Sequence, residues 1–241
     1  MWRFTSFALL SHWNQKNINM EELKKLLTDP FDGVKDINGK VEEIAKELFC
    51  NYYIDCNGKK FYFAEIEFYY WQSDEFDKGF NQEWNRVTYP RNKKAGQLLF
   101  HLSGVDICFK SSYKEENLEE PAKFGGILIR SIKKDENNEV IAGPWNCMLK
   151  ILNECDGKTM PQIKKLKESL DIEENIKSTY RALGKDDIDK EKVNPLKLCF
   201  YDSSIPQKDW SNKYKISLVK KSGKLIWHKS SYKTDRFELE G

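Results

Sequence analysis

The chain has 241 residues, which fits one large domain with a substantial buried core. Its 40 Lys and Arg residues against 38 Asp and Glu residues give a net charge of +2, so the chain lacks a global basic field and a nucleic-acid partner would need a local patch. The six cysteines include no C-x-x-C pair, which argues against a zinc site and a compact disulfide scaffold and is typical of a reducing compartment.

The N-terminal part begins with a short apolar run, followed by two amphipathic segments. The run ends at Leu10 and soon becomes polar, so we expect no signal peptide, no membrane span and a cytoplasmic, intracellular protein. A short helix is predicted over Met20–Leu27. Apolar residues at helical spacing predict a second helix over Val41–Phe49. We expect residues 1–41 to form a helical extension of the region that follows.

The middle of the chain is rich in residues that favour β-structure. Strands are predicted over Tyr52–Cys56 and Lys60–Tyr70, joined by an Asn-Gly turn. Two further strand-like runs cover Gln97–Phe109 and Gly126–Ile132. The polar stretch Ser73–Gly96 is predicted to be a long loop, and loops of that length are usually functional or disordered.

The second half of the chain mixes helical, polar and strand-like segments. A helix is predicted over Gly143–Leu152. Met160–Leu170 is lysine-rich and polar, and Leu183–Val193 is typical of a charged linker or insertion. The lysine-rich stretch Lys158–Lys167 is typical of a solvated helix face, and a contact with a nucleic-acid backbone is the alternative. Three more strand-like segments follow: Leu196–Tyr201, Tyr214–Val219 and Gly223–His228. Without an internal repeat or a clear boundary, hairpins with a few helices predict a single α+β domain over residues 1–241.

The most informative segment is the middle of the strand Lys60–Tyr70, because it carries two carboxylates. Strict alternation divides this strand into two faces: Phe61, Phe63, Glu65, Glu67 and Tyr69 on one, and Ala64, Ile66, Phe68 and Tyr70 on the other. Two acids about 7 Å apart beside aromatic rings are candidates for a general base. The alternative is an edge strand whose two glutamates are solvated.

Several short motifs follow one another along the chain. They are Glu65-Ile66-Glu67-Phe68-Tyr69, Pro90-Arg91-Asn92, the glycine Gly104 within a strand-like run, Gly126-Ile127-Leu128-Ile129-Arg130, Gly143-Pro144 and Pro195–Tyr201. In this order they resemble the E-x-E-x-Y strand, the loop motif and the later strands and helix of the alkyladenine (3-methyladenine) DNA glycosylase family, over about residues 42–201. The resemblance implies a curved, mostly antiparallel β-sheet with flanking helices. It also implies a hydrolase that removes a damaged or modified purine from DNA without a metal ion or another cofactor.

The resemblance also assigns roles to individual residues. Glu67 would be the general base that activates a water for attack on the sugar while the flipped base departs. Arg130 would lie beside Glu67 or hold the adjacent phosphate, and Tyr69 and Phe100 would stack on the two faces of the base. The other assigned residues would bind substrate (Glu65, His101, Lys78 and Ser103) or the nucleic-acid backbone (Arg91, Asn92 and Lys110). Without the resemblance, Phe100 is a core residue, Arg130 a surface arginine at a strand end and His101 a structural histidine.

Three positions depart from the family's pattern. The loop histidine that contacts the flipped nucleotide has Lys78 as its nearest counterpart, the bulky wedge residue is Ser103, and Lys110 replaces an asparagine. Because a small side chain fills little of an opened base stack, Ser103 predicts a preference for single-stranded or already unpaired DNA. Two functions therefore stay open. One is an N-glycosylase whose partner is single-stranded or damaged DNA. The other is a non-catalytic protein of that fold that binds a nucleotide, single-stranded nucleic acid or a protein.

Overall fold

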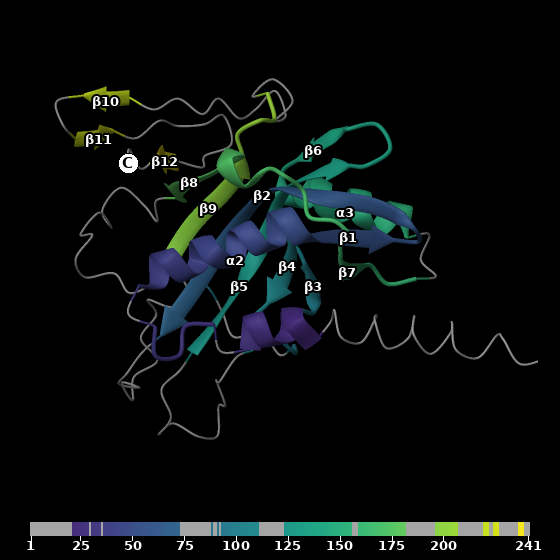
Figure 1. Ribbon diagram of the computed structural model, residues 1–241, viewed down its shortest axis with the longest axis horizontal. Helices are drawn as coiled ribbons and strands as arrows, with labels where there is room; N and C mark the ends of the chain where they lie inside the picture. The colour runs from purple at the N-terminus through teal and green to yellow at the C-terminus, as the bar shows by residue number, and fades with distance from the viewer. Residues whose placement is uncertain are drawn as a thin grey trace, which may run out of the picture.

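The computed structural model describes residues 21–72, 88–110, 123–155, 159–181, 196–206, 219–226 and 236–238, except 29, 35, 89, 90, 92, 222 and 223. Within these ranges, ten strands form one curled sheet whose neighbouring strands are antiparallel (Figure 1). They are β1 (Tyr52–Cys56), β2 (Lys59–Gln72), β3 (Leu98–His101), β4 (Gly104–Cys108), β5 (Lys123–Lys134), β6 (Val140–Ala142), β7 (Gln162–Lys165), β8 (Ile176–Arg181), β9 (Leu196–Asp202) and β12 (Arg236–Glu238). The predicted α+β class is confirmed.

Strand β2 is the centre of this sheet. It pairs with β5 on one side, and on the other side with β1 near its start and with β9 over its second half. The sheet continues from β9 to β8 and β12, and from β5 to β4 and β3. The predicted hairpin of β1 and β2 is confirmed: Asn57 and Gly58 form its turn with φ of 54° and 85°, the left-handed values that a tight hairpin turn requires.

Helices pack against the sheet where the sequence predicts them. Residues 21–28 are helical, α2 spans Ile37–Asn51 and α3 spans Pro144–Glu154. Asp36 caps α2 by accepting a hydrogen bond from the backbone N–H of Gly39 at 2.9 Å. The apolar stripe of α2 is fully buried, and the helix crosses β2 before the chain continues into β1 (Figure 1). No helix within the described ranges has the length and apolar character that crossing a membrane requires.

The two faces of β2 exchange at Ala64 and Glu65. The register with β5 shifts between Phe63 and Glu65 and shifts back between Glu65 and Ile66. Phe63 and Ile66 are three residues apart, yet both lie in the main hydrophobic core, whereas Ala64 packs in a second, smaller cluster. Strict alternation is therefore wrong for the first half of the strand. Phe61 and Phe63 point into the core and not to the face of the glutamates, because a bulge-like irregularity redirects the side chains that follow it.

The run Gln97–Phe109 is a hairpin and not one strand. Strands β3 and β4 pair through a turn at Leu102 and Ser103, with His101 opposite Gly104. Gly104 has φ of 145°, which L-residues rarely adopt, and a Cβ atom there would lie 2.8 Å from the Cβ of Pro144. The glycine therefore allows the hairpin to turn beside the start of α3.

The lysine-rich stretch Lys158–Lys167 also differs from its prediction. It contains strand β7, which pairs with β1, so a solvated helix face is wrong. Within β7, Ile163 is the buried residue and packs into the main core. Strands β6, β8 and β12 were not predicted. The predicted linker Leu183–Val193 and most of Tyr214–Val219 lie outside the described residues, while β10 (Val219–Lys221) and β11 (Lys224–Ile226) form a separate two-stranded sheet.

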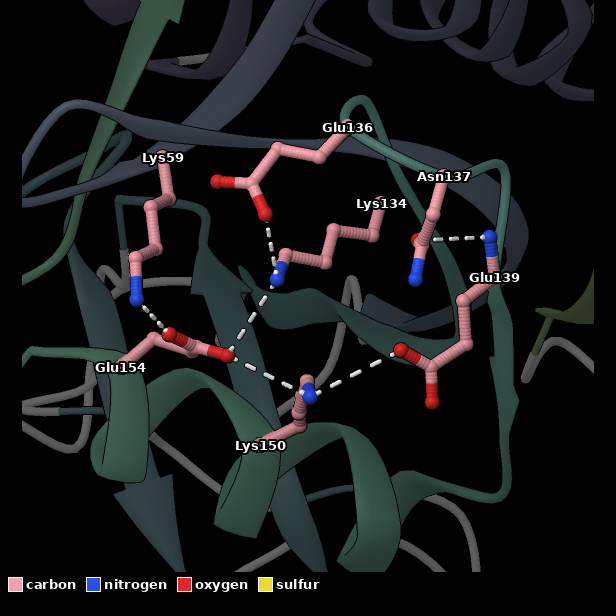
Figure 2. A network of polar contacts seen from close by, with 7 residues as sticks. All are labelled: Lys59, Lys134, Glu136, Asn137, Glu139, Lys150 and Glu154. Atoms are coloured by element: carbon pink, nitrogen blue, oxygen red, sulfur yellow. Dashed lines mark hydrogen bonds and ion pairs between the residues drawn. The ribbon is translucent and has the colours of Figure 1, made fainter.

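A network of ion pairs joins α3 to the strands beside it (Figure 2). The carboxylate of Glu154 contacts Lys59 at the start of β2, lies 3.6 Å from Lys134 at the end of β5 and lies 3.3 Å from Lys150 one turn earlier in α3. Lys134 also reaches Glu136 at 2.7 Å. These cations, first of all Lys59, lower the pKa of Glu154 to about 2 from its ordinary value of 4.5.

Replacing Glu154 with glutamine should therefore destabilise the protein in a pH-dependent way. Because the folded-state pKa is the lower one, the stabilisation by Glu154 is fully present above pH 4.5 and is lost as the pH falls towards 2. Since the side chain is partly solvated, we expect the variant to lose about 1 kcal/mol in the free energy of unfolding at pH 6 and progressively less below pH 4.5. Urea unfolding at several pH values measures this difference.

The matched control is Glu136→Gln, because Glu136 is exposed and contacts Lys134 alone among these lysines. It should change the free energy of unfolding by a few tenths of a kcal/mol or less, about what a solvent-exposed pair contributes. A difference between wild type and Glu154→Gln that stays constant from pH 6 to pH 2 would contradict the assignment.

Candidate functional site

Charged side chains are buried in the middle of the sheet. Five of them, each at most 4% exposed, come from strands β2, β4 and β5 and from the segment before β3: Glu65, Glu67, Arg91, Asp106 and Arg130. Burying a charge is costly unless it is paired and hydrogen-bonded. Apolar residues of similar volume would often stabilise a fold as well or better, so buried ion pairs at the centre of a sheet suggest a use other than stability.

The first group of charges is held together by Arg130. Its Nη1 donates to Oε2 of Glu67 at 2.6 Å, and its Nε donates to Oε1 of Glu65 at 3.2 Å. The hydroxyl of Ser131 donates to the other oxygen of Glu65 at 3.1 Å. One guanidinium is thus shared by two carboxylates that are both completely buried. This arrangement orients Glu67 precisely while leaving the group with more acidic than basic side chains.

The irregularity in β2 and β5 makes this group possible. In a regular ladder Glu65 would be opposite Arg130, but here it pairs with Ser131. Ile66 then pairs with Ile129, so the neighbours Arg130 and Ser131 both reach the glutamates. Sequence alternation predicts that Glu65 and Glu67 share a face, and their common contact with Arg130 agrees with that prediction.

A second group of charges surrounds Asp106 in β4. Arg91 donates from Nε and Nη2 to Oδ2 of Asp106 at 2.9 and 2.7 Å, and from Nη1 to the hydroxyl of Thr88 at 2.7 Å. The Nε2 atom of His101 lies 3.2 Å from the same carboxylate oxygen. The backbone N–H of Ser103 donates to Nδ1 of His101 at 3.2 Å. A ring nitrogen that accepts a hydrogen bond carries no proton, so in the neutral form of His101 the proton is on Nε2.

The two groups lie on the same face of the sheet. Leu128 in β5 is opposite Glu67 on one side and opposite Asp106 on the other. Residues in direct register share a face, and two strand spacings separate the backbones of Glu67 and Asp106 by roughly 10 Å. Among the titratable members, His101 is the one that reaches solvent, with 22% of its side chain exposed. The β3–β4 edge is therefore the solvent-facing side of the site.

Gly126 connects Tyr69 with the second group. It is opposite Tyr69 in the β2–β5 ladder. A Cβ atom on Gly126 would lie 2.8 Å from Nε of Arg91, so the guanidinium occupies the space that any other side chain would need. Tyr69 is 9% exposed and shares its face with Glu67, two residues earlier. The site therefore extends from the Arg130 group past Tyr69 to Arg91.

The structure brings together some of the residues that the sequence singled out. Glu65, Glu67 and Arg130 are in direct contact, and Tyr69 shares their face. His101 lies at the edge of the same face, next to Asp106. The expectation that Arg130 is within side-chain reach of Glu67 is confirmed, and the alternatives of solvated glutamates and a surface arginine are wrong because all three side chains are buried.

Other predicted residues lie elsewhere. Phe100 is opposite Val105 and packs against the main core, so it lies on the other face of the hairpin and not within reach of Glu67. Arg91 was predicted to contact a nucleic-acid backbone, but its guanidinium is enclosed in the ion pair with Asp106. Ser103 and Lys110 are exposed. Lys78 and Asn92 lie outside the described residues, so their roles stay predictions.

Several residues of the site were not predicted, and Asp106 and Leu102 are the most informative of them. Asp106 stands between Val105 and Ile107 in an apolar strand, and an acid in such a run is a signal that sequence inspection can use. Leu102 is 89% exposed at the tip of the β3–β4 hairpin, which the sequence could show only once the turn was placed there. Within the described ranges, no group of three or more His, Cys, Asp or Glu side chains is arranged to hold a metal ion.

Comparison with known proteins identifies a distant relative and no family. No family model matches the sequence, and no solved structure matches the fold. The chain is 28% identical over 153 residues to the uncharacterized protein L759 of Acanthamoeba polyphaga mimivirus, an alignment that covers 59% of this chain and 70% of the relative.

Proposed function

We propose that this protein hydrolyses the N-glycosidic bond of a damaged or modified purine in DNA, with Glu67 as the general base. The observation that carries the proposal is the 2.6 Å contact between Arg130 and Glu67 on a strand face that also holds Tyr69. A base must be held in one orientation to take a proton from a water molecule in the transition state. Arg130 supplies that restraint through the hydrogen bond from its Nη1 to Oε2 of Glu67.

The proposed reaction uses few groups. Glu67 accepts a proton from water as the water oxygen bonds to the anomeric carbon, and the glycosidic bond breaks with its electron pair leaving on the purine. Tyr69 stacks on the purine, a contact that contributes roughly 1–3 kcal/mol and accepts many bases. Phe100 has no part in this scheme because it faces the core. His101, on the solvent-facing side, contacts the incoming nucleotide.

Access to Glu67 requires movement. The residue is completely buried, so a nucleotide reaches it only after neighbouring side chains make room. This burial favours the second candidate function, in which the protein binds single-stranded nucleic acid or a nucleotide on this face without catalysis. The buried ion pairs of Glu65, Glu67 and Arg130 would then hold the β-strands in position and would take no part in a reaction.

Base release distinguishes the two functions. The protein would be incubated with single-stranded and duplex oligonucleotides that contain an alkylated purine or hypoxanthine, and abasic sites would be detected by cleavage in alkali. We expect release from at least one lesion and none from an undamaged oligonucleotide of the same sequence. Tight binding without release from any of these lesions would refute the hydrolase and support the non-catalytic function.

The hairpin tip supplies a candidate for opening a base stack. Ser103 has little volume there, but its neighbour Leu102 is a branched apolar side chain that is 89% exposed. Apolar wedges of this kind enter base steps and unstack them, at an energetic cost of a few kcal/mol per step. We therefore expect Leu102→Ala to weaken binding to damaged duplex by about tenfold, equivalent to roughly 1.4 kcal/mol, and to leave single-strand binding unchanged.

Ser103→Ala is the matched control, since it changes the same exposed turn without removing an apolar wedge. Fluorescence anisotropy with the two substrates at one fixed salt concentration gives the ratio of affinities. If Leu102→Ala leaves that ratio at the wild-type value, the hairpin tip does not open the stack. The preference for unpaired DNA that Ser103 predicts would then stand.

A further inference from the structure

Tyrosines and lysines form a row across four strands, away from the buried charges. Register places Lys164 of β7 opposite Tyr53 of β1, Tyr53 opposite Tyr62 of β2, and Tyr62 opposite Lys133 of β5. Residues in direct register share a face, so the two rings lie side by side between two lysines. All four side chains are partly exposed.

The lysines of this row contact the rings as well as acids. Nζ of Lys60 lies 5.6 Å from the ring centroid of Tyr53, and Nζ of Lys133 lies 6.0 Å from that of Tyr62. Asp55 pairs with Lys164, and Asp135 accepts a hydrogen bond from the hydroxyl of Tyr62 and lies 3.9 Å from Lys60. Three lysines and two aspartates therefore lie along the row, which leaves an excess of one positive charge.

The row continues towards the candidate site. Tyr62 alternates with the core residues Phe61 and Phe63, so it points to the face that the glutamates occupy after the irregularity. On that face Tyr201 of β9 is opposite Glu65 and also opposite the exposed Lys177 of β8. Between Tyr62 and Tyr201 the face is apolar, because Tyr201 packs against the buried cluster of Ala64, Ala142 and Ile205.

We infer that this row, Tyr53 and Tyr62 with Lys60, Lys133 and Lys164, is a track for single-stranded nucleic acid leading to Glu67. Exposed rings accept stacked bases of any sequence, and flexible lysines can leave a ring face to contact phosphate. The one excess positive charge favours an anionic partner, and the neighbouring rings favour a partner with unstacked bases. The inference rests on the proposed function, because the track would deliver a nucleotide to Glu67. Binding of single-stranded nucleic acid to the track does not itself require catalysis.

The test uses fluorescein-labelled oligothymidylate, which contains no purine that the protein could excise, in anisotropy titrations of the full chain. We expect saturable binding that weakens with salt. Tyr53→Ala with Tyr62→Ala should reduce the affinity by roughly tenfold for each ring, whereas Tyr→Phe at both positions should keep it, because stacking does not need the hydroxyl. Oligouridylate in the same assay shows whether the track distinguishes RNA from DNA.

A second pair of variants keeps the test decisive if the alanine variants fail to fold. Lys60→Gln with Lys133→Gln should lower the slope of log affinity against log salt by about 1.4, because each single-strand phosphate contact contributes about 0.7. The exposed Lys25 in helix 21–28 provides a control, Lys25→Gln, that should leave the slope unchanged. A wild type that does not bind oligothymidylate, or lysine variants with an unchanged slope, would overturn the track. Binding with no base release from damaged oligonucleotides would instead refute only the hydrolase.

Discussion

Replacing Glu67 with glutamine should lower the rate of base release by ~10²–10⁴-fold, the usual contribution of a positioned general base. Glutamine has nearly the same volume but cannot accept the proton from water. The fold should survive, since Arg130 keeps its contact with Glu65 and one guanidinium then faces one carboxylate. Single-turnover release of a modified purine, measured beside thermal unfolding, gives both quantities.

Glu65→Gln is the matched control for this experiment. Glu65 is equally buried and binds the same arginine, so the substitution removes the same kind of ion pair while it leaves Glu67 in place. We expect it to lower the rate far less than Glu67→Gln does. Undiminished release by the Glu67 variant would exclude that residue as the base, and equal losses from both variants would point to the ion pair as a whole.

The second large effect concerns stability. Arg130→Met should destabilise the protein by about 3–5 kcal/mol, because it leaves two fully buried carboxylates without the cation that compensates them. Urea unfolding at neutral pH measures the change. Arg130→Lys retains the charge but cannot reach both glutamates with a planar fork, so it should fall between the wild type and the methionine variant.

A combined variant tests the physical reason for that loss. If uncompensated charge is the cause, Arg130→Met together with Glu65→Gln and Glu67→Gln should be more stable than Arg130→Met alone, because the buried charges are then absent. A triple variant that is less stable than the single one would instead mean that the loss comes from packing around the arginine side chain.

Local patterns in the sequence were enough to predict much of the framework. The helical stripe of α2, the Asn57-Gly58 turn and the position of α3 depend on neighbours within a few residues, and each lies where it was predicted. The common face of Glu65 and Glu67 follows from the two-residue repeat of a strand. These features depend on interactions between residues that are close in the sequence, so they can be predicted from the sequence.

The rest depended on which strands meet. The residues near Ala64 carry no sequence signal for the irregularity that directs Phe61 and Phe63 into the core. The irregularity arises from the pairing of β2 with β5, more than 60 residues away in the sequence. The face of the hairpin to which Phe100 points depends on the turn at Leu102 and Ser103. A one-residue change of register would move Phe100 to the opposite face.

The amino-acid sequence alone was enough to predict that Glu65 and Glu67 share a strand face and that Arg130 follows an apolar run. The pairing of distant strands was needed to show that Arg130 bridges both acids and that Arg91 and Asp106 form a second buried ion pair. The physical reason is that an ion pair between distant strands has no local signature. It forms because burial removes water from all of its members at once, and each charge is then stabilised only by the partner that the sheet places beside it.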